Sequence, residues 1–188
     1  MIKHRINHLL NWITLRRNGV KYSTFQIRGR IYVENHEGSL VIGPNFSANS
    51  GQDANPIGGD TILRLIVQNQ QATLTIGHHV GISNSTIVCW DHIVIGNHVI
   101  IGGGCKIWDT NFHSLNPHIR MSGADDNILT KPVFIDDYVF VGGGVTILKG
   151  VHIGKHSVIA AGSVVYDDIP AGVLAGGNPC QIIRSLEL

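Results

Sequence analysis

The chain has 188 residues and a formal net charge of +1; charged residues make up 14% of it and glycine occurs 23 times. A composition this apolar and this poor in charge excludes a disordered chain, and the absence of an excess of basic residues argues against a nucleic-acid partner. No apolar run reaches the roughly 20 residues that a membrane-spanning helix needs, and three cysteines without paired spacing predict reduced thiols in a cytoplasmic protein.

The first 19 residues are predicted to form an amphipathic helix that ends at Asn18-Gly19. Its apolar positions follow the helical period, and its basic residues lie on or near the polar side: Ile2, Ile6, Leu9, Leu10 and Ile13, with Lys3, Arg5, Arg16 and Arg17. We expect the helix to cover the open end of a solenoid, with a weak contact to a membrane surface as the alternative. Residues 20–73 contain short apolar strands and are predicted to form irregular first coils.

Residues 74–170 carry an internal repeat in which an aliphatic residue recurs every six positions. This period fits neither a long strand nor a helix, but it fits a short strand followed by a tight corner. Three such units close one triangular coil, and stacked coils place the aliphatic residues in one core. The repeat therefore predicts an all-β parallel β-helix in a single domain, residues 1–188, with these inward residues: Ile76, Ile82, Val88, Ile95, Ile101, Ile107, Ile135, Val141, Ile147, Ile153, Ile159 and Val165.

One large interruption, between Ile107 and Ile135, predicts a protruding loop over residues 108–132. A solenoid gains no core from such an excursion, and long loops without regular structure are usually functional or disordered. This loop carries several apolar residues, so we expect it to dock on a neighbouring subunit: Phe112, Leu115, Ile119, Met121 and Ile128.

The sequence over residues 75–184 resembles the hexapeptide-repeat acyltransferases, and its C-terminal third resembles their maltose and galactoside O-acetyltransferase branch. The ending GSVV-x-DDIP-x-GV-x-AGGNPC, residues 162–180, is the most specific part of this resemblance. The resemblance implies a left-handed β-helix, a short C-terminal segment over residues 171–188, and a homotrimer with acetyl-CoA in the groove between two β-helices. It also implies four contacts to that co-substrate: Gly143 and Ala161 on the coils, Tyr166 beside the adenine and Arg184 near the phosphates.

The same resemblance places a catalytic histidine on the loop, where His113 lies. An imidazole titrates near neutral pH, so it can take the hydroxyl proton as the oxygen attacks the thioester; the alternative is a solvated histidine. Asp109 or a backbone carbonyl would orient the imidazole, and the alternative for Asp109 is a turn or capping role. Asn84 matches a family residue that contacts the acceptor, where an amide would hold a hydroxyl or stabilise the oxyanion; the alternative is an asparagine that tolerates a left-handed corner.

Three residues depart from the family pattern around CoA, namely Phe140, Asp167 and Gln181, and each is expected to weaken contacts to the adenine or the phosphates. They leave the acyl-transfer chemistry untouched.

The predicted function is an O-acetyltransferase that moves an acetyl group from acetyl-CoA to a saccharide hydroxyl without a metal. Direct transfer in a ternary complex is expected, because no cysteine or serine shows the pattern of an acyl-enzyme nucleophile. A sugar-amine N-acetyltransferase and an inactive structural trimer are alternatives. A further alternative is a gamma-class carbonic anhydrase-like enzyme, with a metal held by His78 or His79 together with His113 and His118.

Overall fold

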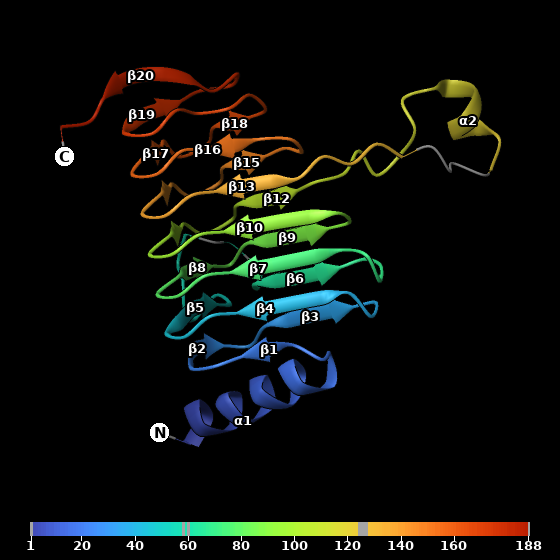
Figure 1. Cartoon of the computed structure of the whole chain (residues 1–188). Coiled ribbons are helices and arrows are strands. Elements are labelled where there is room, and N and C mark those ends of the chain that lie inside the picture. The colour runs from blue at the N-terminus through green and yellow to red at the C-terminus, as the bar shows by residue number, and fades with distance from the viewer. Residues whose placement is uncertain (1, 58, 60, 124–127, 188) are drawn as a thin grey trace.

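The computed structural model describes residues 2–57, 59, 61–123 and 128–187, and it shows a parallel β-helix with a helix at its N-terminal end (Figure 1). The chain winds through three sheets in turn, so that each coil gives one strand to each sheet. Helix α1, Ile2–Arg17, lies below the first coil. A loop that contains the short helix α2, Pro117–Met121, projects from the side of the stack.

Each sheet is a column of short parallel strands along the axis of the β-helix. Sheet A contains β1 Lys21–Tyr22, β4 Ser39–Ile42, β7 Thr73–Ile76, β10 His92–Ile95, β13 Val133–Ile135 and β16 His152–Ile153. Sheet B contains β2 Phe25–Gly29, β5 Phe46–Ser50, β8 Gly81–Ser83, β11 Ile100–Ile101, β14 Phe140–Val141, β17 Val158–Ile159, β19 Val173–Gly176 and, antiparallel at its end, β20 Gln181–Ser185. Sheet C contains β3 Tyr32–Asn35, β6 Arg64–Val67, β9 Thr86–Cys89, β12 Lys106–Trp108, β15 Thr146–Ile147 and β18 Val164–Val165.

The core runs along the axis and consists of aliphatic side chains that point inward from all three sheets. Pairing places like residues above one another, so that Ile101 is paired with Ile82 on one side and with Val141 on the other. The inward positions that the repeat predicts are buried, with the exception of Val88. The prediction for Val88 is wrong: strand β9 turns its neighbours Ile87 and Cys89 inward, and Val88 is half-buried.

This shift originates in the corner after β8. Ile82 pairs with Ile101 and Ile87 pairs with Ile107, so five positions separate the inward residues in one coil and six in the next. The corner that holds Asn84 is therefore one residue shorter than the corner above it. Because side chains alternate along a strand, a shift of one residue moves Val88 out of the core.

The coils before residue 74 are regular, contrary to the expectation of irregular first coils. Strand β1 pairs with β4, β2 with β5 and β3 with β6, in parallel and in the same three sheets as the later coils. The six-residue spacing is hidden there because a second loop, whose described residues are 51–57, 59 and 61–63, separates β5 from β6.

The N-terminal helix is present, but the residues that it buries fully are not among the predicted apolar positions. Ile6 and Leu9 are 51% and 55% exposed, whereas Asn11 and Leu15 are buried. The Asn11 side chain donates to the carbonyl of Gly29 at 3.0 Å and accepts from the N–H of Ile31 at 3.2 Å. The first coil has no coil below it to pair with, so its open backbone groups need a polar partner, and an amide supplies one. Neither described helix has the length and apolar character that crossing a membrane would require.

Candidate functional site

The corner between sheets B and C is lined by residues with short side chains, which we call the small-residue corner: Gly51, Asn84, Gly103, Gly143 and Ala161. Hydrogen bonds join these corners from coil to coil. The N–H groups of Gly104, Gly144 and Gly162 donate to the carbonyls of Asn84, Gly103 and Gly143 at 3.1, 2.8 and 2.9 Å. The column therefore presents coil backbone at the surface, against which a long ligand can lie.

Glycine stands at two neighbouring positions of this corner, 142 and 143, for different physical reasons. A Cβ on Gly142 would lie 2.6 Å from the backbone nitrogen of Ala161, so glycine is required there for the coils to approach. A Cβ on Gly143 would meet nothing closer than the carbonyl oxygen of Gly103, at 3.2 Å. Gly142 thus serves packing, and Gly143 leaves space at the surface of the corner.

Asn84 has the left-handed backbone that the sequence offered as one of two explanations, and its role in catalysis stays a prediction. Its φ of +36° places it in the left-handed region, which asparagine tolerates better than most residues. Its side-chain oxygen accepts a hydrogen bond from the N–H of Gly51 at 2.7 Å. Its side-chain Nδ2 is buried and finds no hydrogen-bond partner in the described part of the chain. A buried amide without an acceptor costs about 1–3 kcal/mol, so this N–H group calls for a functional explanation.

Sequence reasoning missed the second loop, residues 51–63, which borders Asn84. The Thr61 hydroxyl donates to the Asn84 carbonyl at 3.0 Å. A Cβ on Gly143 would lie 4.0 Å from the side chain of Ile57, which is 83% exposed. The loop therefore extends along the small-residue corner. Its signal was the gap between the inward residues Ala48 and Leu65, much longer than six positions.

His113 lies on the other loop, between β12 and β13, and is exposed. The two limbs of that loop are tied together by a bridge between Thr110 and Thr130 and by the N–H of Asn111, which donates to Leu129 at 3.0 Å. The loop leaves the corner between sheets C and A, whereas Asn84 lies at the corner between sheets B and C. Within one chain the two predicted catalytic residues thus belong to different corners.

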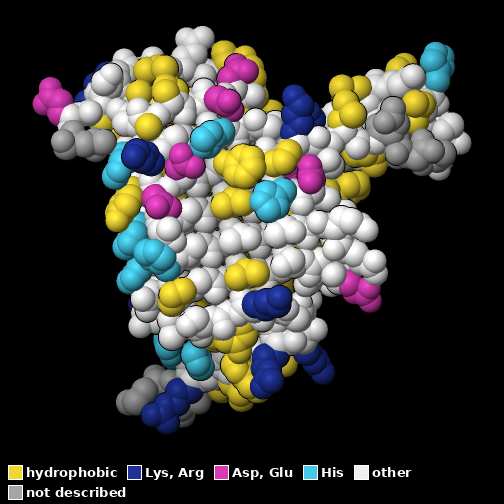
Figure 2. Space-filling model, viewed as in Figure 1, with side chains coloured by type: hydrophobic (Ala, Val, Ile, Leu, Met, Phe, Trp, Pro, Cys, Tyr) yellow, Lys and Arg dark blue, Asp and Glu magenta, His cyan; other side chains and the backbone are white. Residues whose placement is uncertain are grey.

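Apolar side chains of the same loop stand uncovered. Leu115 and Met121 are 69% and 81% exposed, and Figure 2 shows apolar surface on the projecting part of the molecule. Ile119 and Ile128 are half-buried, while residues 124–127 of the predicted loop lie outside the described residues.

Asp109 is fully buried at the base of this loop. Its carboxylate accepts from the N–H groups of Trp90 and Asp91 at 2.7 and 2.8 Å, and its carbonyl accepts from the N–H of Lys131 at 2.9 Å. Burial raises the pKa of the Asp109 carboxyl, against the effect of the two N–H donors. These contacts are those of the capping role; the role of orienting His113 stays a prediction.

The thiols are poorly suited to attack a thioester. Burial raises the pKa of Cys89, where the charge of Asp109 adds to the effect, and burial also raises the pKa of Cys105 and Cys180. The thiolate is the reactive form of cysteine, so these shifts disfavour an acyl-cysteine intermediate.

The remaining predicted CoA contacts lie near the C-terminal end of the β-helix. Tyr166 follows β18 and is 50% exposed, and Arg184 is exposed on β20. The three departures from the family pattern, Phe140, Asp167 and Gln181, are exposed as well. The contacts of these residues to CoA stay predictions.

Histidines gather at a third place, the corner between sheets A and B, visible along one edge of the molecule in Figure 2. The rings of His79 and His98 stack at 4.8 Å, and His78 meets His98 edge-on at 4.9 Å. His113 and His118 belong to the projecting loop instead. Within the described ranges of this single chain, no group of three or more His, Cys, Asp or Glu side chains is placed to hold a metal ion.

The comparisons with known proteins agree with this architecture. Residues 132–167 match the family model "Bacterial transferase hexapeptide (six repeats)". Over 97–98% of its length the chain is similar to solved structures, among them a hexapeptide-repeat acetyltransferase of Vibrio cholerae in complex with acetyl coenzyme A, with a TM-score of 0.62, 25% identity and 85% of that chain covered. The prediction of a left-handed parallel β-helix of the hexapeptide-repeat type is confirmed.

Curated relatives are acetyltransferases. The galactoside O-acetyltransferase of Lactococcus lactis is 46% identical over 103 residues, which cover 55% of this chain and 48% of that protein. A tetrahydropyridine-dicarboxylate N-acetyltransferase of Clostridium perfringens is 54% identical over 56 residues, or 30% of this chain and 24% of that protein. The chain thus spans about half the length, or less, of the curated relatives it matches. The resemblance to the hexapeptide-repeat acyltransferases, with their galactoside O-acetyltransferase branch, is confirmed.

Proposed function

We propose that the protein is an acetyl-CoA-dependent O-acetyltransferase that acts on a hydroxyl group of a saccharide. The observation that carries the proposal is the buried amide of Asn84, in the middle of the small-residue corner, which has no hydrogen-bond partner among the described residues. An open strip of backbone suits a long, thin co-substrate, and an N–H group without an acceptor suits a carbonyl oxygen that gains negative charge.

In the proposed reaction, the imidazole of His113 takes the proton from the acceptor hydroxyl as the oxygen attacks the thioester carbonyl. A carbon–oxygen bond forms, and the tetrahedral oxyanion accepts a hydrogen bond from the Asn84 amide. The carbon–sulfur bond then breaks, and the departing thiolate of CoA takes the proton from the imidazolium. The raised thiol pKa values support this direct route.

We propose a homotrimer, because His113 and Asn84 lie at different corners of one chain and the loop of His113 carries uncovered apolar residues. A loop that docks on the small-residue corner of the next copy would bury Leu115 or Met121 and bring the two predicted catalytic groups together.

The test is a thiol-release assay with acetyl-CoA and a panel of mono- and oligosaccharides. His113→Ala is expected to lower kcat/KM by about 10²- to 10⁴-fold, the usual contribution of a general base, with CoA binding intact. His118→Ala, on α2 of the same loop, is the matched control and should keep its turnover. Normal turnover in His113→Ala would refute the assignment of the base.

Complementation tests the shared site. Mixed assemblies of His113→Ala and Asn84→Gly copies should regain part of the activity. With random mixing about one site in four takes His113 from an Asn84→Gly copy and Asn84 from a His113→Ala copy, so both residues are intact there. If the two residues act from the same chain, no activity returns.

An N-acetyltransferase is the second candidate, favoured by the 54% identity of a 56-residue stretch to an enzyme of that name. Amino sugars in the same panel distinguish the two: a higher kcat/KM for the amine than for the matching hydroxyl compound would replace O-acetylation by N-acetylation.

A further inference from the structure

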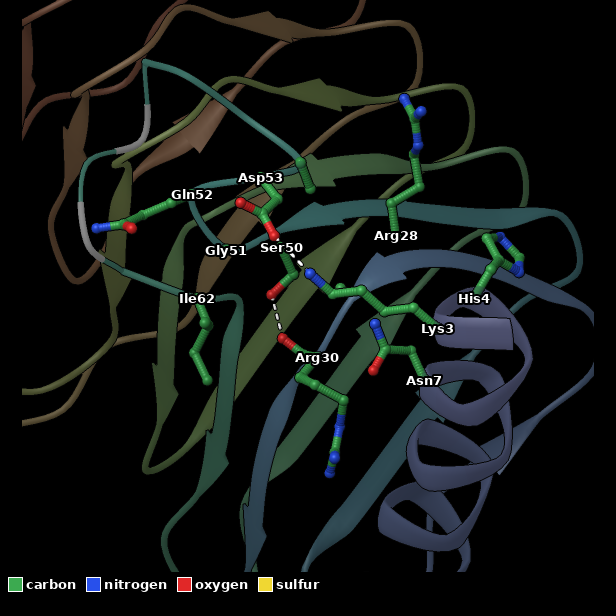
Figure 3. A pocket seen from close by; sticks show the side chains of 12 residues that line it. Lys3, His4, Asn7, Arg28, Arg30, Ser50, Gly51, Gln52, Asp53 and Ile62 are labelled. Carbon is green, nitrogen blue, oxygen red and sulfur yellow. Dashed lines mark hydrogen bonds and ion pairs between the residues drawn. The ribbon is translucent and has the colours of Figure 1, made fainter. Parts of the chain in front are cut away.

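A cleft of about 590 Å³ lies between the N-terminal helix and the start of the second loop (Figure 3). Helix α1 forms one wall with its first two turns. The last two residues of β2, the following Arg30 and residues 50–54 form the opposite side. No part of the sequence motif that indicates the family contributes to this cleft.

The rim of the cleft is positively charged. Lys3, Arg28 and Arg30 line it together with a single carboxylate in the described lining, Asp53. Lys3 Nζ lies 2.7 Å from Asp53 Oδ2, so that carboxylate already has a partner. The guanidinium groups of Arg28 and Arg30 have no hydrogen-bonding or ion-pair partner among the residues that the structure describes, and Figure 3 shows the two side chains extending in opposite directions, one on either side of Lys3. Among the described residues, no carboxylate compensates these two cationic side chains.

The cleft adjoins the proposed reacting centre. Gly51 lines it, and the N–H of the same residue donates to the Asn84 side chain at 2.7 Å. Ser50, which is buried, fixes this wall: its hydroxyl donates to the carbonyl of Arg30 and accepts from the N–H of Leu63. A molecule held in the cleft thus lies at one end of the small-residue corner, next to the residue that would face the acceptor.

We infer that this cleft binds an anionic group of the acceptor, a carboxylate or a phosphate carried by a sugar unit. The inference rests on the proposed function and specifies its substrate class. Guanidinium groups form paired hydrogen bonds with carboxylate and phosphate oxygens, and two free ones at the rim of a cleft favour an anion over a neutral sugar. The anion would bind at Arg28 or at Arg30, whose side chains extend in opposite directions from the rim, and a hydroxyl of the same or the adjoining sugar would lie near Asn84.

Calorimetric binding without acetyl-CoA tests the site apart from the reaction. The probes are galacturonate and galactose 1-phosphate, with neutral galactose as the matched ligand. We expect the anionic sugars to bind at least about tenfold more tightly than galactose. The double variant Arg28→Gln/Arg30→Gln should remove this preference, whereas Arg17→Gln, an exposed arginine at the end of α1 outside the cleft, should keep it. The stronger of the two anionic probes identifies carboxylate or phosphate as the recognised group.

In the acetyl-transfer assay the double variant should raise KM for an anionic acceptor with little change in kcat, since the reacting groups remain. If the protein acetylated only neutral saccharides, and if the double variant did so at the same rate, the inference would be overturned and the proposed function would stand. Selective binding of the anionic probes without transfer to any acceptor would uphold the anion site and refute the proposed function. Equal binding of galactose and the anionic probes would also overturn the inference.

Discussion

Two corners of the same β-helix both turn the chain sharply, but they carry different kinds of side chain. At the corner between sheets A and B, left-handed φ angles of 56–63° fall on residues with side chains, which form a column: Asn45, His79, His98, Tyr138 and His156. The rings of the last four of these residues stack from coil to coil, with His98 4.8 Å from Tyr138 and Tyr138 5.0 Å from His156. At the corner between sheets B and C, glycine and alanine take the place of these large side chains at most coils.

The difference shows where a ligand has room. Stacked rings cover the backbone of the first corner and stabilise it by contact between coils. The second corner lacks these contacts, and it holds the Asn84 amide, for which the described residues supply no acceptor. One edge of this solenoid is thus stabilised by stacked side chains, and another is the edge at which we propose that CoA binds.

The largest effect on turnover is expected at Asn84, and Asn45, which also has a left-handed φ, provides the comparison. Asn84→Gly keeps the backbone conformation, since glycine accepts a φ of +36°, and removes the amide. We expect kcat to fall by about 10²- to 10³-fold, as for loss of one oxyanion donor. Asn45→Gly, at a φ of +60° in the stacked corner, is the control and should keep its kcat. A comparable loss in both variants would show that the effect is on folding.

A second comparison lies within the small-residue corner. Gly142→Ala places a Cβ 2.6 Å from a backbone nitrogen, so overpacking should lower the free energy of unfolding by about 1–3 kcal/mol. Gly143→Ala has 3.2 Å to its nearest neighbour and should cost less stability, but it should weaken CoA binding. Urea unfolding and CoA titration of both variants check this, and equal effects on both measurements would contradict the division of roles.

The stacked corner should matter for stability alone. His98→Ala removes ring contacts to His79 and Tyr138 and puts alanine at a φ of +57°, so we expect a loss of about 1–2 kcal/mol in unfolding free energy. His98→Gly also removes the ring, but glycine adopts a φ of +57° without strain, so this variant measures the contribution of stacking alone. Turnover at saturating substrates should match that of the wild type in both; a drop in well-folded variants would contradict this assignment.

The smallest effect concerns pH. The N–H of Asn97 donates to Asp137 at 2.6 Å and holds the pKa of that carboxyl below its usual value, with the nearby His78 and His98 adding to the shift. A depressed pKa in the folded state stabilises the protein above the unfolded pKa of about 3.9, and this stabilisation is lost as the pH falls through the folded pKa.

Asp137→Asn is therefore expected to be slightly less stable than the wild type near neutral pH, with the two unfolding curves converging in acid. Asp167→Asn, an exposed carboxylate outside this corner, serves as the control. Urea midpoints measured across the acid range check the trend, which a constant difference would refute.

The sequence predicts the fold well where the repeat is uninterrupted. From Ile135 to Val165 each predicted inward residue is buried, because a period of six with small corner residues has few other solutions. Val88 fails because the Asn84 corner is one residue shorter, and residues 51–63 hide the regular coils before residue 74. The buried face of α1 could not be predicted either. It was chosen by unpaired backbone groups at the open end of the β-helix, which bond the Asn11 side chain, and not by burial of the most apolar face of the helix.

By itself, then, the order of the residues determined the coil, its core and the bare corner, because these depend on neighbours a few positions apart. The tertiary structure decided what depends on distant segments: the orphaned amide of Asn84 beside Gly51, the contacts of Asp109 across the base of the loop, and the basic cleft formed by Lys3, Arg28 and Arg30. Periodicity is a local property that a sequence displays, whereas burial and charge compensation arise only when chain segments far apart come into contact.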